Sequence, residues 1–254
     1  DAGIHGSGLN FGLSAAISDL NADGYPDIYV TNDYEEQDFC YINNGDGTFA
    51  DMTGECLTHI SLTSMGNDIA DINNDGYMDI ITMDMLPDDN RRQKLLMSAN
   101  NYEKYDLNIR SGFHRQYMRN MLQLNNGNET FSEIGQLSGI SNTDWSWSSL
   151  FADFDNDGWK DLMVTNGYMR NYLDMDFLSY MVSEKVNNQQ SNRNVVLLDL
   201  INKMPPIEVQ NYLYRNNGDL TFTKVGEAWG LDLAGFSNGA AYGDLDGDGA
   251  PDLV

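Results

Sequence analysis

The sequence is poor in basic residues, histidine and cysteine, and it contains no long apolar segment. Lys and Arg number 14 against 39 Asp and Glu in 254 residues, which gives a formal net charge of −25. A surface this acidic repels phosphate backbones, so we predict no direct nucleic-acid binding. The longest apolar runs have four residues, so we expect no transmembrane segment. Three histidines are too few to favour a His-based catalytic triad or a histidine-rich zinc site.

The two cysteines and the chain ends leave open questions. Cys40 and Cys56 could pair as a disulfide or remain two free thiols, and their spacing favours neither. The chain starts at Asp1 without Met and stops at Val254 within an apolar run. We therefore expect a piece of a longer protein, which a signal peptide or a lipid anchor could precede. The hydrophobic content of 41% argues against a disordered acidic tail.

An acidic pattern of nine residues recurs along the chain, which indicates an internal repeat. It has the form D-x-[DN]-x-D-G-x-x-D and occurs four times. The copies are residues 19–27, 71–79, 153–161 and 244–252, here called loops 1 to 4. Short runs with high β-propensity flank each copy, which indicates that every loop joins two strands.

A second pattern, Asn-Asn-Gly between apolar stretches, occurs between the loops at residues 41–49, 122–131 and 213–222. It predicts hairpin turns, because Asn and Gly tolerate positive φ. Each repeat then supplies four antiparallel strands, which is the plan of a β-propeller blade. In the second repeat the expected strands are residues 66–70, 79–83, 120–124 and 130–134.

The predicted fold is all-β, a single partial β-propeller over residues 1–254 with about four blades of four antiparallel strands. Extra sequence at residues 86–120 and 168–207 forms insertions between the second and third strands of blades two and three. Helical spacing predicts mainly helical insertions, with helices over residues 89–100, 175–186 and 194–204. Since a closed propeller has complete blades all round, we expect this chain to form part of a ring.

The acidic pattern has the chemistry of a calcium loop. Its carboxylates repel one another unless a cation lies among them. Oxygen ligands at positions 1, 3 and 5, with Gly at position 6 for the sharp turn, favour Ca²⁺ over zinc or copper. Asp at position 9 would close the site, and position 7 would contribute a backbone carbonyl, so its side chain would be free to vary. The alternative is that the loops are ordinary solvated turns.

We predict up to four Ca²⁺ ions, one in each loop, that stabilise the hairpins. The predicted ligands of loops 1 and 2 are Asp19, Asn21, Asp23, Tyr25, Asp27, Asp71, Asn73, Asp75, Tyr77 and Asp79. Those of loops 3 and 4 are Asp153, Asp155, Asp157, Trp159, Asp161, Asp244, Asp246, Asp248, Ala250 and Asp252. Because each loop supplies five ligands of its own, we expect no catalytic role for these ions.

These repeats resemble FG-GAP/VCBS repeats, the calcium-binding blades of integrin α-chain propellers. Phe11 and Gly12, followed by loop 1, are close to that motif. The pairing of an Asn-Asn-Gly turn with a following acidic loop resembles more specifically the bacterial ASPIC/UnbV group, related to cartilage acidic protein. The resemblance implies a seven-bladed propeller, calcium in the loops and an extracytoplasmic binding or adhesion role. Asn21 and Asn73 depart from the pattern, because each replaces an Asp and lowers the charge of its loop.

Strand order places the loops and the Asn-Asn-Gly turns on one rim and both insertions on the opposite rim. We expect the opposite rim to recognise a protein or glycan partner. The candidate residues are Arg91, Arg92, Lys94, Trp145, Trp147 and Trp229. Two alternatives stay open: the basic residues could dock on the chain's own acidic blades, and the tryptophans could pack between blades.

Three functions are compatible with these features. The first is a calcium-stabilised, extracytoplasmic binding or adhesion propeller that is not an enzyme. The second is a polysaccharide-active enzyme on the same scaffold, for which Asp84, Asp144, Asp174 and Asp176 are the candidate acids. The third is a structural subunit of a surface complex. Asp84 and Asp144 also suit turn or capping positions, and no phosphate loop, nucleophile elbow or zinc signature occurs.

Overall fold

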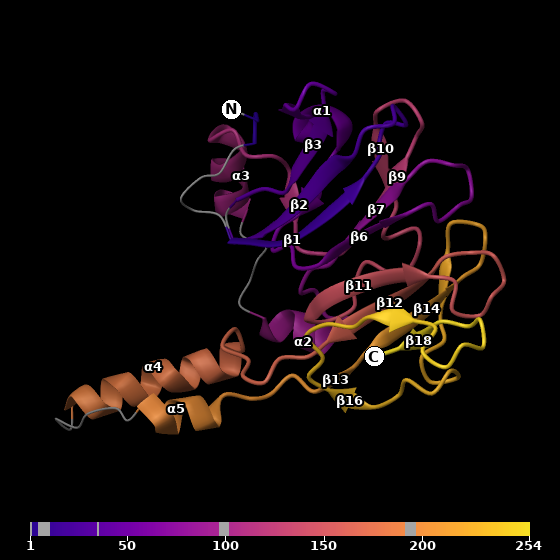
Figure 1. The fold of residues 1–254 in the computed structure, drawn as a ribbon. Helices are drawn as coiled ribbons and strands as arrows, with labels where there is room; N and C mark the ends of the chain where they lie inside the picture. The colour runs from indigo at the N-terminus through magenta and orange to yellow at the C-terminus, as the bar shows by residue number, and fades with distance from the viewer. Residues whose placement is uncertain (1, 5–10, 35, 97–101, 191–196) are drawn as a thin grey trace.

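Three four-stranded antiparallel sheets and a fourth, smaller sheet follow one another along the chain in the computed structural model (Figure 1). The structure describes residues 2–4, 11–34, 36–96, 102–190 and 197–254. Every loop of the acidic pattern joins the first two strands of its sheet. The predicted all-β, propeller-type architecture is therefore confirmed, whereas the number of blades in a complete ring stays a prediction.

The first sheet has the order β1-β2-β3-β4, as a propeller blade requires. Its strands are β1 (Phe11–Ser18), β2 (Asp27–Asp33), β3 (Phe39–Asn43) and β4 (Phe49–Asp51). Alternate residues of β2 are buried, since one face of this sheet packs on the next sheet.

The second sheet matches its predicted strands within one residue at each end. It consists of β6 (Asn67–Ala70), β7 (Asp79–Thr82), β9 (Met121–Asn125) and β10 (Phe131–Glu133). All four residues of β7 are buried, which fits a strand covered on both faces by neighbouring sheets.

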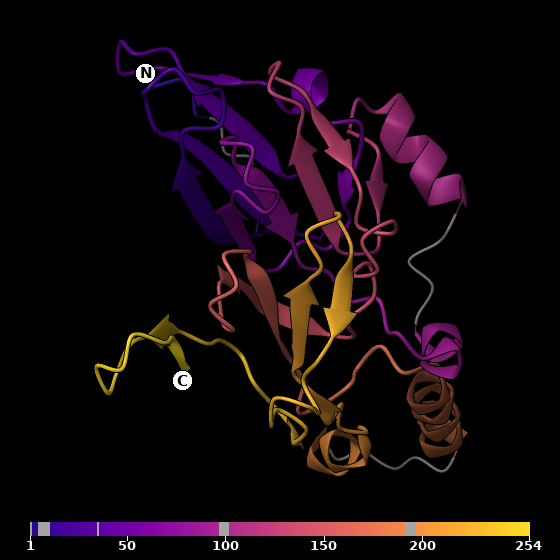
Figure 2. The same cartoon turned by 90° about the vertical axis from the view of Figure 1, so that its right-hand side faces the viewer.

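The third sheet is built in the same way, and the fourth is smaller. The third consists of β11 (Ser146–Ala152), β12 (Asp161–Asn166), β14 (Tyr212–Asn216) and β15 (Phe222–Lys224). The fourth pairs β17 (Tyr242–Gly243) with β18 (Asp252–Leu253) around loop 4. Figure 2 shows this last pair, in yellow, extending to one side of the third sheet.

Most helices lie on the side away from the loops (Figure 1). α2 and α3 connect β7 to β9, while α4 and α5 connect β12 to β14. Asp89 caps α2 by accepting the Arg92 N–H, but α2 ends at Leu95, short of the predicted residue 100, and residues 97–101 lie outside the described part. The helices are α1 (Thr53–Cys56), α2 (Asn90–Leu95), α3 (Tyr102–Arg110), α4 (Met175–Gln190) and α5 (Leu197–Lys203).

Small sheets tie the connections together on the helix side. Parallel pairing joins β5 (Ile60–Ser61) to β8 (Gln116–Tyr117), and antiparallel pairing joins β13 (Val209–Gln210) to β16 (Ala234–Gly235). No helix in the described ranges combines the length and the apolar character that a membrane span requires.

The core lies between successive sheets, in two apolar clusters. The larger cluster joins the second and third sheets through side chains such as Ile81, Leu122 and Leu162, each fully buried. The smaller cluster joins the first and second sheets and includes Cys40 and Cys56, which are buried free thiols. A thiol hydrogen bond to Cys56, together with burial, raises the pKa of Cys40, so both sulfurs act as core side chains.

Candidate functional site

The four acidic loops share one hydrogen-bonded frame. In loop 1, Asp19 accepts the Asp23 N–H through Oδ1 (3.1 Å) and the Gly24 N–H through Oδ2 (2.8 Å). Asp71, Asp153 and Asp244 accept the corresponding pairs of N–H groups in loops 2 to 4. The position-6 glycines have φ between 89° and 93°, which the sharp turn requires. Position 1 therefore shapes the loop even before any ion is considered.

The carboxylate at position 9 fastens each loop to its own sheet. Asp79 is fully buried and accepts the Ile72 N–H (3.0 Å) and the Asn125 N–H (2.8 Å). Asp27 and Asp161 do the same in loops 1 and 3. Burial, together with the neighbouring loop carboxylates, raises the pKa of Asp79 to about 7 and of Asp161 to about 6. A cation beside these groups would favour their ionised form.

Loops 3 and 4 bring three carboxylates together closely enough to hold a metal ion. One oxygen each from Asp153, Asp155 and Asp161 lies within 4.8 Å of the others. The same holds for Asp244, Asp246 and Asp252 in loop 4. These are positions 1, 3 and 9 of the pattern, and a set of carboxylate oxygens suits a hard cation. In loops 1 and 2 the position-3 oxygen belongs to Asn21 or Asn73, whose side chain accepts the position-5 N–H.

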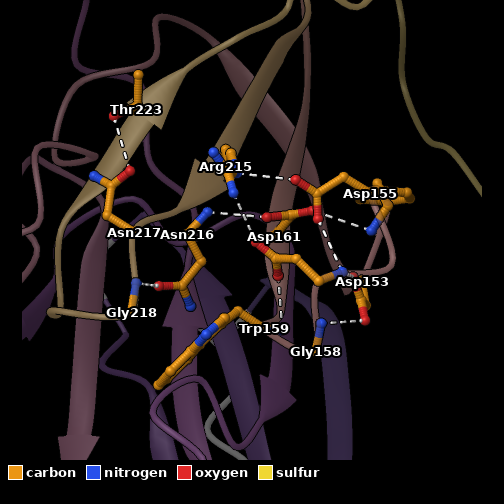
Figure 3. A network of polar contacts seen from close by, with 12 residues as sticks. Asp153, Asp155, Gly158, Trp159, Asp161, Arg215, Asn216, Asn217, Gly218 and Thr223 are labelled. Atoms are coloured by element: carbon orange, nitrogen blue, oxygen red, sulfur yellow. Dashed lines mark hydrogen bonds and ion pairs between the residues drawn. The ribbon is translucent and has the colours of Figure 1, made fainter.

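The carboxylate at position 5 faces a different partner. Asp157 accepts the Trp159 N–H (3.0 Å) through Oδ1, while its Oδ2 lies 2.9 Å from Arg215 Nη2. The Nε of Arg215 contacts Asp155 Oδ2 at 2.9 Å (Figure 3). Arg215, on β14, therefore touches two of the predicted ligands of loop 3. Sequence reasoning missed this contact, because Arg215 is more than fifty residues from the loop.

In loops 1 to 3 the side chain at position 7 is an aromatic ring with a packing partner, a contact that the sequence-based expectation of a freely varying side chain did not include; loop 4 has Ala250 there. A Cβ on Gly45 would meet the Tyr25 ring at 3.0 Å, and one on Gly127 would meet Tyr77 at 2.7 Å. Trp159 lies over Gly218 in the same way (3.0 Å). The ring packs on the glycine of the Asn-Asn-Gly turn, so it couples that turn to the loop and needs Gly there.

In blades 2 and 3, the first Asn of the Asn-Asn-Gly turn links the loop to the neighbouring blade. Asn216 Nδ2 donates to Ile72 O in loop 2 (2.8 Å) and to Lys160 O in loop 3 (3.0 Å). Asn125 likewise donates to Leu20 O in loop 1 (2.8 Å) and to a carbonyl of its own blade. One side-chain amide thus connects adjacent loops. The sequence analysis assigned these Asn residues only to hairpin turns and did not predict this contact between blades.

The predicted partner-binding residues fall into two groups. Arg91 and Lys94 are exposed on α2, and Trp229 is half-buried in a turn. Arg92 instead pairs with Asp144 at 2.9 Å. This contact favours the alternative in which the basic segment docks on the chain's own blades.

The other two tryptophans lie in an aromatic cluster rather than on an open surface. Trp145 is only 3% exposed and stacks on Tyr168 with ring centroids 4.4 Å apart. Trp147 donates its indole N–H to Gly167 O (2.8 Å). Burial leaves Trp145 without a surface to offer a ligand, which favours the packing alternative for this pair.

Three of the four carboxylates considered for catalysis have structural partners, and the fourth, Asp176, is exposed in the first turn of α4. Buried Asp84 accepts hydrogen bonds from the Ser61 and Thr63 hydroxyls and from several backbone N–H groups. Asp144 accepts from the Trp145 N–H as well as from Arg92, and Asp174 accepts from the Phe177 N–H at the start of α4. These three acids therefore have structural roles in turns and caps.

A family model described as FG-GAP-like repeat matches residues 19–82, 106–164 and 195–254. The chain belongs to the FG-GAP-like repeat family. Together the matches cover more than half of the sequence, and each one ends within two residues of the end of the strand that follows loop 2, 3 or 4. The predicted FG-GAP resemblance is thereby confirmed, while the finer assignment to the ASPIC/UnbV group stays a prediction. No curated protein matches this sequence.

Proposed function

We propose that this FG-GAP repeat chain is a calcium-stabilised binding or adhesion propeller that works outside the cytoplasm. Its partner would be a protein or a glycan, recognised on the rim opposite the acidic loops. The observation that carries the proposal is the loop frame, which recurs four times and directs carboxylate oxygens to a common point in loops 3 and 4.

Calcium fits these loops better than other common cations. The donors are carboxylate, amide and carbonyl oxygens, which a hard cation prefers, and Mg²⁺ requires a smaller octahedral site with retained water. Repulsion among the carboxylates is strongest without an ion, and a cation would relieve it. Loops of this kind suit compartments with abundant Ca²⁺, where affinities of roughly 10⁻⁴–10⁻³ M suffice. An extracytoplasmic location follows from that argument.

The opposite rim is the better place for recognition. The helices α2 to α5 gather there (Figure 1), and the sheets to which they are joined supply a base. Arg91 and Lys94 provide exposed positive charge on a chain that is otherwise strongly acidic. An anionic glycan or an acidic protein surface would complement them. Since Asp84, Asp144 and Asp174 bond to the chain itself, the geometry supports a binding module over a glycosidase.

Thermal unfolding with bound-metal analysis tests the calcium part. We expect the Tm in millimolar Ca²⁺ to exceed the Tm in excess chelator by roughly 10 °C, as expected when an ion binds only the folded state. Elemental analysis should find up to four Ca²⁺ per chain. Replacing Ca²⁺ by Mg²⁺ should restore little of the stability. Equal Tm values in Ca²⁺ and chelator, with no bound metal, would refute it.

Glycan and protein arrays test the recognition part. The double variant Arg91→Glu, Lys94→Glu should lose binding to whatever ligand the wild type retains, with the Tm unchanged. Lys185→Glu on α4 is the matched control, since this exposed lysine lies in the other insertion. Product release from a bound glycan would instead indicate an enzyme, and equal binding by all variants would remove α2 from the interface.

A further inference from the structure

Loop 3 has Asp at position 3, where loops 1 and 2 have Asn, and Arg215 lies beside this additional carboxylate. We infer that Arg215 is a built-in counter-charge, which does for loop 3 what an asparagine at position 3 does for the first two loops. Its effect on calcium rests on the proposed function, whereas its effect on the ion-free loop does not.

In the first two loops, the position-3 side chain steadies the position-5 carboxylate. Asn21 Nδ2 donates to Asp23 Oδ2 at 2.9 Å, and Asn73 Nδ2 donates to Asp75 Oδ2 at 2.8 Å. The Asn amide thus donates a hydrogen bond to the outer oxygen of the position-5 carboxylate and adds no negative charge. Each of these loops carries three carboxylates in nine residues.

Loop 3 has Asp155 at position 3, which supplies a fourth carboxylate and no N–H donor. The outer oxygen of Asp157 is instead filled by Arg215 Nη2, and the same guanidinium reaches Asp155 Oδ2 (Figure 3). Arg215 therefore donates the hydrogen bond that the Asn amide donates in loops 1 and 2, and it also carries the positive charge that offsets the extra carboxylate.

The same place on the third strand is apolar in the other two blades. Arg215 directly precedes the first Asn of its Asn-Asn-Gly turn, as Ile42 and Leu124 do in theirs. Among the three blades that have a third strand here, the one with Asp at position 3 has Arg on that strand, and the two with Asn at position 3 have an aliphatic residue. An arginine on the third strand beside a loop with Asn at position 3 would lack its second carboxylate partner. An Asp at position 3 without that arginine would add a fourth carboxylate with no counter-charge.

Two consequences follow for loop 3. Without an ion, the guanidinium holds Asp155 and Asp157 against β14 and reduces their repulsion. With an ion, the same positive charge weakens the attraction of the loop for a divalent cation. Loop 3 should therefore keep its shape in the absence of calcium and bind calcium less tightly than its four carboxylates alone would.

The test compares the wild-type chain with Arg215→Leu and with the double variant Asp155→Asn, Arg215→Leu, which recreates the loop 1 pairing. Lys160→Gln is the control, because Lys160 belongs to loop 3 but makes no contact with its carboxylates among the described residues. Tm is measured in chelator and in saturating Ca²⁺, and Ca²⁺ affinity is measured by calorimetric titration with CaCl₂.

In chelator, Arg215→Leu should lower Tm by about 2–4 °C, and the double variant should recover most of that loss. Lys160→Gln should leave Tm in chelator within about 1 °C of the wild type. In Ca²⁺ the deficit of Arg215→Leu should shrink, and one site should bind about threefold more tightly. An unchanged Tm for Arg215→Leu in chelator, or a double variant as unstable as the single one, would overturn the inference.

A wild-type chain that binds no Ca²⁺ would refute the proposed function and the predicted change in affinity. The comparison of the three variants in chelator would still decide whether Arg215 compensates Asp155.

Discussion

The two rims of the sheets differ in how strictly their contacts repeat. On the loop rim, formed by loops 1 to 4 and the Asn-Asn-Gly turns, the same bonds recur from blade to blade with nearly the same distances. On the insertion rim, formed by α2 to α5 and the connections, equivalent places carry different chemistry. The N–H of the residue five places after the position-9 Asp, at or near the end of the second strand, is accepted by a different side chain in each blade: Asp38 in blade 1, Asn120 in blade 2 and Asn211 in blade 3.

This difference separates two kinds of constraint. A cation site must keep its oxygens in place, so loops that share one ion chemistry share one frame. The proposed recognition surface needs only a stable base, so each connection can differ in length and composition. The following predictions test whether the loop rim depends on calcium and the insertion rim on packing and hydrogen bonds alone.

Removing one buried carboxylate from each rim should separate them most clearly. Asp79→Ala orphans two buried N–H groups and should cost about 3 kcal/mol in chelator, with a larger loss in Ca²⁺ because loop 2 would also lose its proposed ion. Asp84→Ala removes an acceptor of several hydrogen bonds and should cost about 4 kcal/mol. Denaturant unfolding in Ca²⁺ and in chelator gives both values. A calcium-dependent loss for Asp84→Ala would erase the distinction between the rims.

The link between adjacent loops should be the next largest effect. Asn216→Ala leaves carbonyls of two blades without their donor and should cost about 2 kcal/mol. Asn43 is the matched control, since its amide is described only on Pro26 O within its own blade, at an exposed site. Asn43→Ala should cost about 0.5 kcal/mol by the same denaturant measurement. Equal losses would show that the contact between blades adds nothing.

Asp38 makes the insertion rim sensitive to pH. Burial raises the pKa of Asp38 from 3.8 to about 7, although it accepts hydrogen bonds from Asn32, Ser64 and Tyr29. The folded chain keeps this proton up to about pH 7, whereas the unfolded chain loses it near pH 4. The stabilisation is therefore complete below pH 4 and disappears as pH rises to 7.

The variant Asp38→Asn removes that titration. The wild type should lose stability relative to Asp38→Asn between pH 4.5 and 7.5, measured in saturating Ca²⁺ so that the loop carboxylates stay ionised. A difference in unfolding free energy that does not change with pH would contradict the assignment to Asp38.

The smallest effect is expected when a hydrogen bond of blade 3 is introduced at the equivalent place in blade 1. Ser146 donates its hydroxyl to Asn166 Oδ1 (2.8 Å) in blade 3, while Gly12 holds the same register position in blade 1 opposite Asn32. The Asn32 Oδ1 is buried and has no partner among the described residues, and a Cβ on Gly12 would lie 3.4 Å from it. Gly12→Ser should add about 1 kcal/mol of stability. Gly12→Ala is the control, and an equal gain there would mean that only backbone entropy changed.

Much of the repeat architecture could be predicted because its signals are local. The strands of blade 2 lie within one residue of the predicted ranges, since the acidic pattern and the Asn-Asn-Gly turn mark their ends. Helix α2 was less predictable: Asp89 marked its start, but no signal marked its end at Leu95. The free state of Cys40 and Cys56 also depended on the fold, because sequence spacing carries no information on how two thiols meet.

The sequence by itself determined the loops, because nearly every bond of their frame joins residues within nine positions of one another. The tertiary structure decided what surrounds them. Arg215 meets Asp155, Asn125 meets Leu20 and Trp145 stacks on Tyr168 only once separate strands have packed together. The physical reason is range: a turn is specified by φ angles and short hydrogen bonds, whereas contacts between blades depend on how whole sheets dock.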